Sequence, residues 1–171
     1  TIKKSKPKQF ACEYIDRHTY FGKKLKNAFS DLQIATWNVE GFTDEKLISL
    51  EVVRQKYDIP ILCIQETHKA GSEYFITDHG SLVILAGSNN HDHTEHAGVG
   101  FIVAPHVRSS LINFCQYNSR LYYLKLKIKG GKLAIISAYA PHAGHPFDER
   151  QRFFDDLGDM HQALSCNGGC I

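Results

Sequence analysis

Two polar residues, Asn38 and Glu66, stand where apolar runs of the chain end, and their side chains could act together. Asn38 ends the run at 32–38, and Glu66 directly follows the run at 59–65. Such runs are typical of buried strands, and in open α/β sheets chemistry collects at the carboxyl ends of strands. A carboxylate and an amide oxygen side by side suit a hard cation such as Mg²⁺, which prefers oxygen ligands and keeps several waters.

The segment between the two runs has the features of a helix. Gly41 breaks the first strand, Thr43 can cap a helix, and Asp44 and Glu45 suit the positive end of its dipole. Apolar residues then recur at helical spacing and predict one buried face: Leu47, Leu50, Val53 and Tyr57. A strand, a helix and a second strand leave no room for a hairpin, so the two strands are predicted to be parallel.

The rest of the chain continues the alternation of strands and helices. Residues 69–81 are expected to form a loop with some strand character at 74–76. Further strands are expected at 82–86, 98–103, 109–115, 120–128 and 133–139, and a second helix at 147–164. Gly130-Gly131 predicts a hairpin that makes the last two strands antiparallel. One face of the 120–128 strand is expected to be buried through Leu121, Tyr123, Leu124, Leu126 and Ile128.

Charge divides the chain into unequal parts. Residues 1–30 carry eight Lys or Arg against two acidic residues, a net charge of +6, whereas the remainder carries twelve basic and sixteen acidic residues, a net charge of −4. We therefore separate a basic arm at 1–30 from a body at 31–164 and an unrelated Gly-rich tail at 165–171. A basic arm could contact phosphate, although a solvated tail accounts for it equally well.

The cysteines and the apolar runs bear on the cellular setting. Five cysteines are an odd number, and Cys63 and Cys115 lie in apolar surroundings typical of core thiols. No signal segment precedes the body and no run is long enough to span a bilayer, so we expect no membrane partner. These features favour a reduced, intracellular setting, with the nucleus as one option. Because the chain begins with Thr1, it is expected to be a piece of a longer polypeptide.

Four motifs, in chain order, resemble the endonuclease/exonuclease/phosphatase superfamily. They are Thr36-Trp37-Asn38-Val39, Gln65-Glu66-Thr67-His68, Gly98-Val99-Gly100-Phe101 and Tyr139-Ala140-Pro141. Within the superfamily the chain is most similar to endonuclease domains of non-LTR retrotransposons and their craniofacial-development-protein-like relatives, and next to abasic-site endonucleases. The resemblance covers 32–164 and implies an α/β four-layer sandwich of two packed mixed β-sheets flanked by helices, incomplete at the C-terminus.

The resemblance also implies an activity and roles for named residues. The superfamily cuts phosphodiester bonds with Mg²⁺ or Mn²⁺, and DNA is the expected partner. Glu66 would bind the metal, Asn38 would help to hold the metal or its waters, and Tyr139 would contact the scissile phosphate. Arg120 resembles a position that contacts the nucleic-acid backbone. His142 replaces an Asn of the abasic-site enzymes, and His68 adjoins Glu66 in a supporting position.

Two elements of the superfamily's active site have no match in this sequence. Phosphodiester hydrolysis needs a base to activate water, and in the superfamily a Gly-Asp-x-Asn segment after the long helix serves this purpose. Gly158-Asp159 lies inside the 147–164 helix and is followed by Met160-His161, and no Asp-His pair follows the helix. We therefore expect a C-terminally truncated nuclease domain that hydrolyses little or nothing by itself.

Other interpretations of the chain stay open at this point. The chain could be a lipid or inositol-phosphate phosphodiesterase of the same superfamily, or a non-catalytic remnant that binds nucleic acid through its basic arm. The polar loop at His91–His96 resembles a metal cluster, but its spacing is loose for zinc. A zinc knuckle of His161, Cys166 and Cys170 lacks a second cysteine pair, so a structural zinc ion is not the favoured interpretation of either segment.

Overall fold

The computed structural model describes residues 13–14, 32–88, 97–165 and 169–170. Expectations for the basic arm, for the His91–His96 loop and for Cys166 therefore lie outside the described residues, except that Glu13–Tyr14 forms the short strand β1. Within the described part of the chain, no helix has the length and apolar character needed to cross a bilayer.

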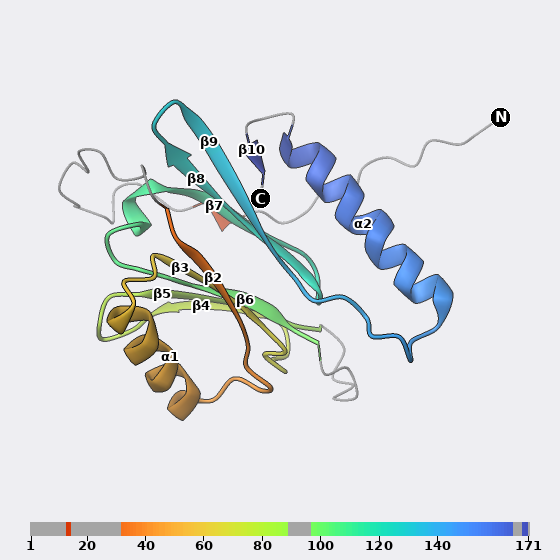
Figure 1. The fold of residues 1–171 in the computed structure, drawn as a ribbon, viewed down its shortest axis with the longest axis horizontal. Helices are drawn as coiled ribbons and strands as arrows, with labels where there is room; N and C mark the ends of the chain where they lie inside the picture. Colours follow the sequence, from red (N-terminus) through yellow and green to blue (C-terminus); the bar gives the residue numbers. More distant parts are fainter. Residues whose placement is uncertain (1–12, 15–31, 89–96, 166–168, 171) are drawn as a thin grey trace.

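Two packed five-stranded sheets with one helix on each outer side form the four layers of the molecule (Figure 1). The first sheet has the strand order β2-β3-β6-β5-β4, and the second has the order β1-β7-β8-β9-β10. Each sheet combines parallel and antiparallel neighbours, because β2 is parallel to β3 and β10 is parallel to β9. The structure thus confirms the expected α/β sandwich of two mixed sheets.

The first sheet contains the two strands that end at the candidate site. Its strands are β2 (Ile34–Asn38), β3 (Ile61–Gln65), β4 (Ser72–Ile76), β5 (Leu82–Ala86) and β6 (Val99–Val103), and α1 (Asp44–Lys56) connects β2 to β3. β2 and β3 are parallel, with Ile34 opposite Ile61 and Asn38 opposite Gln65. The predicted crossover is confirmed, and it brings the carboxyl ends of both strands to the same edge.

The second sheet is built around a long antiparallel meander. It contains β7 (Leu111–Asn118), β8 (Leu121–Ile128) and β9 (Gly131–Ala138), preceded by the short 3₁₀ helix η2 (Arg108–Ser110) and followed by α2 (Phe147–Ser165). The predicted hairpin at Gly130-Gly131 pairs Ile128 with Gly131 and Leu121 with Ala138. The sequence did not indicate β10 (Gly169–Cys170), a two-residue strand within the Gly-rich tail.

Three buried clusters fill the three interfaces between the four layers. Between the sheets, residues of β3, β5 and β6 meet Phe114, Tyr122, Leu124 and Leu126 of the second sheet. The opposite face of the first sheet packs against α1 through Leu50, and the outer face of the second packs against α2 through Phe153, Met160 and Leu164. Apolar residues are needed on both faces of the central strands, which explains their uninterrupted apolar runs.

The buried face of β8 differs from the sequence prediction. Tyr122, Leu124 and Leu126 face the first sheet, whereas Leu121 and Tyr123 face α2. Because side chains alternate along a strand, a face containing both Tyr123 and Leu124 was not attainable. Cys63 and Cys115 are buried as expected, and burial raises the pKa of the Cys63 thiol to about 12.

Helix α1 begins as predicted but is held to the sheet partly by polar groups. The Thr43 hydroxyl accepts a hydrogen bond from the Lys46 N–H at 3.3 Å, which confirms the cap. Tyr57, expected on the buried face, is 60% exposed and lies just beyond Lys56, the last residue of the helix. Glu51 and Arg54 are instead buried, at 3% and 4% exposure.

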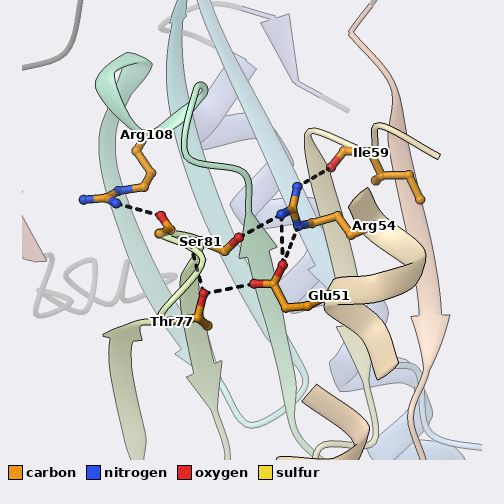
Figure 2. A network of polar contacts seen from close by, with 7 residues as sticks. Glu51, Arg54, Ile59, Thr77, Ser81 and Arg108 are labelled. Carbon is orange, nitrogen blue, oxygen red and sulfur yellow. Dashed lines mark hydrogen bonds and ion pairs between the residues drawn. The ribbon is translucent and has the colours of Figure 1, made fainter. Parts of the chain in front are cut away.

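Glu51 and Arg54 form the centre of a buried polar network, which Figure 2 shows. Arg54 Nη2 donates to Glu51 Oε2 at 2.9 Å and to Ser81 Oγ at 3.0 Å, and Thr77 Oγ1 donates to Glu51 Oε1 at 3.1 Å. The network ties α1 to the segment that joins β4 and β5. It therefore fixes the helix, and with it the β2–α1 loop, over the sheet.

Candidate active site

Asn38 and Glu66 are in direct contact at the carboxyl edge of the first sheet. Asn38 is the last residue of β2, opposite Gln65 of β3, and Glu66 follows Gln65. Asn38 Nδ2 donates a hydrogen bond to Glu66 Oε1 at 2.8 Å. Parallel pairing of two consecutive strands therefore brings together residues that are 28 positions apart in the sequence.

Tyr139 reaches the same carboxylate from the second sheet. Its hydroxyl donates to Glu66 Oε1 at 2.6 Å. This hydrogen bond raises the pKa of the Tyr139 phenol above its ordinary value, with burial and the charge of Glu66 acting in the same direction and Arg120 opposing them. Nearby, the Ser137 hydroxyl of β9 donates to the Ile64 carbonyl at 3.3 Å, so the two sheets are joined beside the site.

The backbone around Glu66 has an unusual conformation. Glu40, Glu66 and His68 all have positive φ, at 48°, 54° and 53°. Side chains other than glycine rarely adopt this conformation, and such strain concentrates at functional sites. Hydrogen bonds hold it in place: the Gly41 N–H donates to the Glu66 carbonyl at 2.7 Å, and the His68 N–H donates to the Ala97 carbonyl at 3.1 Å.

Gly98 makes room for the segment that carries Glu66. A Cβ atom at Gly98 would lie 2.2 Å from Thr67 Oγ1, and the φ of Gly98 is +119°. Both observations require glycine at this position. The Gly98-Val99-Gly100-Phe101 motif thus contributes to the site through close backbone packing against Thr67.

Arg120 lies next to Tyr139 because the hairpin places them opposite each other. The Tyr139 N–H donates to the Arg120 carbonyl at 2.9 Å, and the guanidinium carbon lies 5.4 Å from the centre of the Tyr139 ring. The Arg120 side chain also forms an ion pair with Glu149 of α2 at 3.7 Å. Arg120 is 8% exposed, so its charge is held at the wall of the site.

Asn38, Glu66 and Tyr139 form the central group of the site, and the two predicted histidines lie at different distances from it. His68 Nε2 is 3.9 Å from Glu66 Oε2, so His68 belongs to the group. His142 packs its ring against His145, with ring centres 4.3 Å apart, and accepts a hydrogen bond from the Gly144 N–H. His145 in turn contacts Glu149 at 3.0 Å, which connects His142 to Arg120 only through two intervening side chains.

Sequence reasoning missed Glu149 and Glu40. One oxygen of Glu149 contacts both Arg120 and His145, and the Glu40 N–H donates to Asn38 Oδ1 at 3.4 Å. The spacing of His145 and Glu149, four residues apart at the start of α2, was a signal that could have revealed one of these contacts. The contact between Glu149 and Arg120 had no local signal, since it joins α2 to the β7–β8 turn.

The donor atoms of the central group suit a hard divalent cation. Glu66 supplies a carboxylate and Asn38 an amide oxygen, and Asn38 is exposed. Within the described ranges, no three His, Cys, Asp or Glu side chains gather closely enough to hold a metal ion. One carboxylate with neighbouring oxygen groups fits Mg²⁺ or Mn²⁺, which keep several waters, better than zinc, whose structural sites require four protein ligands.

Comparisons with known proteins show which proteins the chain is similar to in sequence and in fold. Craniofacial development protein 2 of Bos taurus is 29% identical over 135 residues, and that of Tragulus javanicus is 30% identical over 138 residues. These matches cover 78% of this chain but only 22% and 23% of the relatives, so the chain spans less than a quarter of their length. No family model matches the chain.

One solved structure supports the fold. The catalytic domain of Xenopus laevis APE2 superimposes with a TM-score of 0.58 at 19% sequence identity. The match covers 80% of this chain and 55% of that domain. The shared architecture therefore includes both sheets, and the similarity concerns the fold.

Proposed function

We propose that this chain, whose fold is that of the endonuclease/exonuclease/phosphatase superfamily, carries the metal-binding and phosphate-binding part of a site for phosphodiester hydrolysis in nucleic acid. DNA is the proposed substrate, and a divalent cation, Mg²⁺ or Mn²⁺, is the proposed cofactor. The supporting observation is the convergence of Asn38 and Tyr139 on one oxygen of Glu66, at 2.8 Å and 2.6 Å, with Arg120 beside the Tyr139 ring.

Glu66 is the proposed cation ligand, and Asn38 orients it. The hydrogen bonds from Asn38 and Tyr139 fix the carboxylate, and ligands oriented in this way bind metals more tightly. The Asn38 amide oxygen, which also accepts from the Glu40 N–H at 3.4 Å, would help to hold the cation or its waters. When bound, the cation supplies positive charge that stabilises the phosphoryl oxygens as charge develops on them.

Tyr139 and Arg120 are the proposed phosphate contacts. The Tyr139 phenol has a single proton, which it donates to Glu66 in this structure, so it would donate to a phosphate by redirecting that hydrogen bond once a cation holds Glu66. The Arg120 guanidinium matches the geometry of phosphate oxygens and keeps its charge at every physiological pH. Both groups are preorganised by their contacts, and preorganised donors stabilise charge without the cost of reorganisation. His68 supports the orientation of Glu66.

We propose that the chain by itself hydrolyses DNA slowly or not at all, because its sequence contains neither the Gly-Asp-x-Asn segment nor an Asp-His pair after α2. The test is nicking of supercoiled plasmid with Mg²⁺, alongside Mn²⁺ titration of the same protein. We expect Mn²⁺ binding, salt-dependent DNA binding and little nicking. Robust nicking that is lost in Glu66→Ala would contradict the low activity, and absence of both Mn²⁺ and DNA binding would contradict the proposed function.

Nucleic-acid binding without hydrolysis is the second candidate. The basic composition of residues 1–30, with eight Lys or Arg against two acidic residues, favours it, because such a segment can neutralise phosphates without any hydrolysis. DNA binding that falls steeply with salt and needs no divalent cation would support this candidate. Deletion of residues 1–30 separates binding by the basic arm from binding by the Arg120 and Tyr139 group.

A further inference from the structure

A pocket of about 430 Å³ has Arg120 in its lining. The β7–β8 turn, the loop after β9 and the first half of α2 form its walls. Its lining includes Asn118, Arg120, Pro141, Glu149, Phe153 and Asp156. The volume lies near the small end of the range for small-molecule sites, about 300–1,000 Å³, and is large enough for one nucleoside.

The charges that line this pocket favour a hydrogen-bond donor over a second phosphate. Asp148, Glu149 and Asp156 supply three carboxylates, against the guanidinium groups of Arg120 and Arg152. Each arginine forms an ion pair with one of them, Arg120 with Glu149 at 3.7 Å and Arg152 with Asp148 at 4.0 Å. Asp156 is the one of these three carboxylates that neither arginine pairs with, and its charge favours groups that donate hydrogen bonds over a second phosphate.

Two hydrogen bonds fix the side chain of Asp156, which is part of the pocket lining. Asn118 Nδ2 donates to Asp156 Oδ2 at 3.1 Å, and the Tyr117 hydroxyl donates to Asp156 Oδ1 at 3.3 Å. Asn118 Oδ1 accepts a hydrogen bond from the backbone N–H of Arg120 at 2.9 Å. The carboxylate is therefore oriented before any ligand arrives, and each of its oxygens can accept one further hydrogen bond.

The buried guanidinium of Arg120 joins the pocket to the proposed phosphate site. Arg120 is 8% exposed, it lines the pocket, and its guanidinium makes no hydrogen bond among the described residues beyond the long ion pair with Glu149. The same group lies 5.4 Å from the Tyr139 ring. A phosphate held by Arg120 and Tyr139 would thus place its adjoining nucleoside next to the pocket.

We infer that this pocket binds one unpaired nucleoside next to the scissile phosphate and prefers bases with an exocyclic amino group. The apolar surfaces of Pro141, Pro146 and Phe153 contact the base, and the carboxylates accept from its amino group, as Asp and Glu do from cytosine N4. The base must leave the duplex stack to enter. The inference rests on the proposed function and names the substrate at the same site.

The test measures binding of short single-stranded oligonucleotides by fluorescence anisotropy at low salt. Oligo-dT is compared with the same oligomer carrying one central dC, and with one carrying N4,N4-dimethyl-dC, which keeps the ring but lacks the amino hydrogens. We expect the dC oligomer to bind about tenfold more tightly than the other two. Asp156→Asn should reduce this preference to about twofold, whereas Asp155→Asn, one residue away and outside the pocket lining, should retain it.

The outcomes separate the inference from the function on which it rests. The wild-type comparison needs no variant, so an Asp156→Asn protein that fails to fold does not remove the test. Equal binding of all three oligomers would overturn the pocket assignment and leave the proposed function standing. Absence of binding to every oligomer, with no Mn²⁺ binding, would overturn both.

Discussion

Two glutamates of the first half of the chain lie in opposite kinds of site. Glu51 is buried against Arg54, Thr77 and Ser81, and its charge is paired with a guanidinium at 2.9 Å (Figure 2). Glu66 lies at the sheet edge, and its two hydrogen bonds at Oε1 come from neutral groups, the Asn38 amide and the Tyr139 hydroxyl. The first carboxylate is paired with a guanidinium inside the fold, whereas the second lies at the sheet edge, where His68 Nε2 is 3.9 Å from its other oxygen.

The pKa of Glu51 shows that the polar partners of its carboxylate outweigh the effect of burial. Burial by itself raises this pKa, but the hydrogen bonds of Ser81, Arg54 and Thr77 and the charge of Arg54 lower it below its ordinary value. Glu51 therefore stays ionised as a structural anion. The comparison separates a carboxylate whose cation partner is built into the fold, Glu51, from the carboxylate for which we propose an external cation, Glu66.

The largest expected effect follows from removing the internal cation. Arg54→Ala leaves Glu51 buried without its charge partner, which should lower the free energy of unfolding by about 3–5 kcal/mol in urea denaturation. Lys56→Ala, at an exposed position two residues further along the same helix, is the matched control and should change it by less than about 0.5 kcal/mol. The double variant Glu51→Met/Arg54→Met should recover most of the loss, since no unpaired charge remains. An Arg54→Ala protein as stable as the control would refute the structural role of the pair.

An intermediate effect is expected when the surface-facing carboxylate loses its charge. Glu66→Gln should weaken Mn²⁺ binding by at least about 10–100-fold, the range seen when groups that merely orient a metal ligand are lost. Its free energy of unfolding should change by less than about 1 kcal/mol, because Gln can still accept the two hydrogen bonds. Glu73→Gln, on the exposed strand β4, is the control for Mn²⁺ binding. A large loss of stability with unchanged Mn²⁺ affinity would place Glu66 with Glu51 among the structural carboxylates.

The smallest expected effect concerns alkaline pH. The folded protein holds the Tyr139 proton more tightly than the unfolded chain, whose phenols titrate near pH 10. The corresponding stability is therefore fully present below about pH 10 and is lost as pH rises through the folded pKa. Tyr139→Phe should make the decline of the free energy of unfolding above pH 10 shallower. Tyr117, whose phenol pKa is raised by burial and by Asp156, should give the same result when changed to Phe. A decline equally steep in Tyr139→Phe and wild type would show that the hydrogen bond to Glu66 contributes nothing.

Much of the fold and the centre of the site could be predicted from local patterns. The helical spacing between Thr43 and Lys56, flanked by two apolar runs, determined a parallel crossover and so the contact between Asn38 and Glu66. Gly130-Gly131 determined the hairpin register that brings Arg120 opposite Tyr139. Both contacts depend on pairing between neighbouring strands, which short-range sequence features specify.

Only the tertiary structure decided which side chains meet across the layers. The contact of Tyr139 with Glu66 depends on how one sheet packs on the other, and that of Arg120 with Glu149 on where α2 lies. The sequence pattern places Glu51 and Arg54 on the polar face of the helix. They are buried because the segment joining β4 and β5, which is distant in sequence, packs against them. Periodicity specifies the face of an element, but the partner of that face comes from packing between elements distant in sequence, which no local pattern encodes.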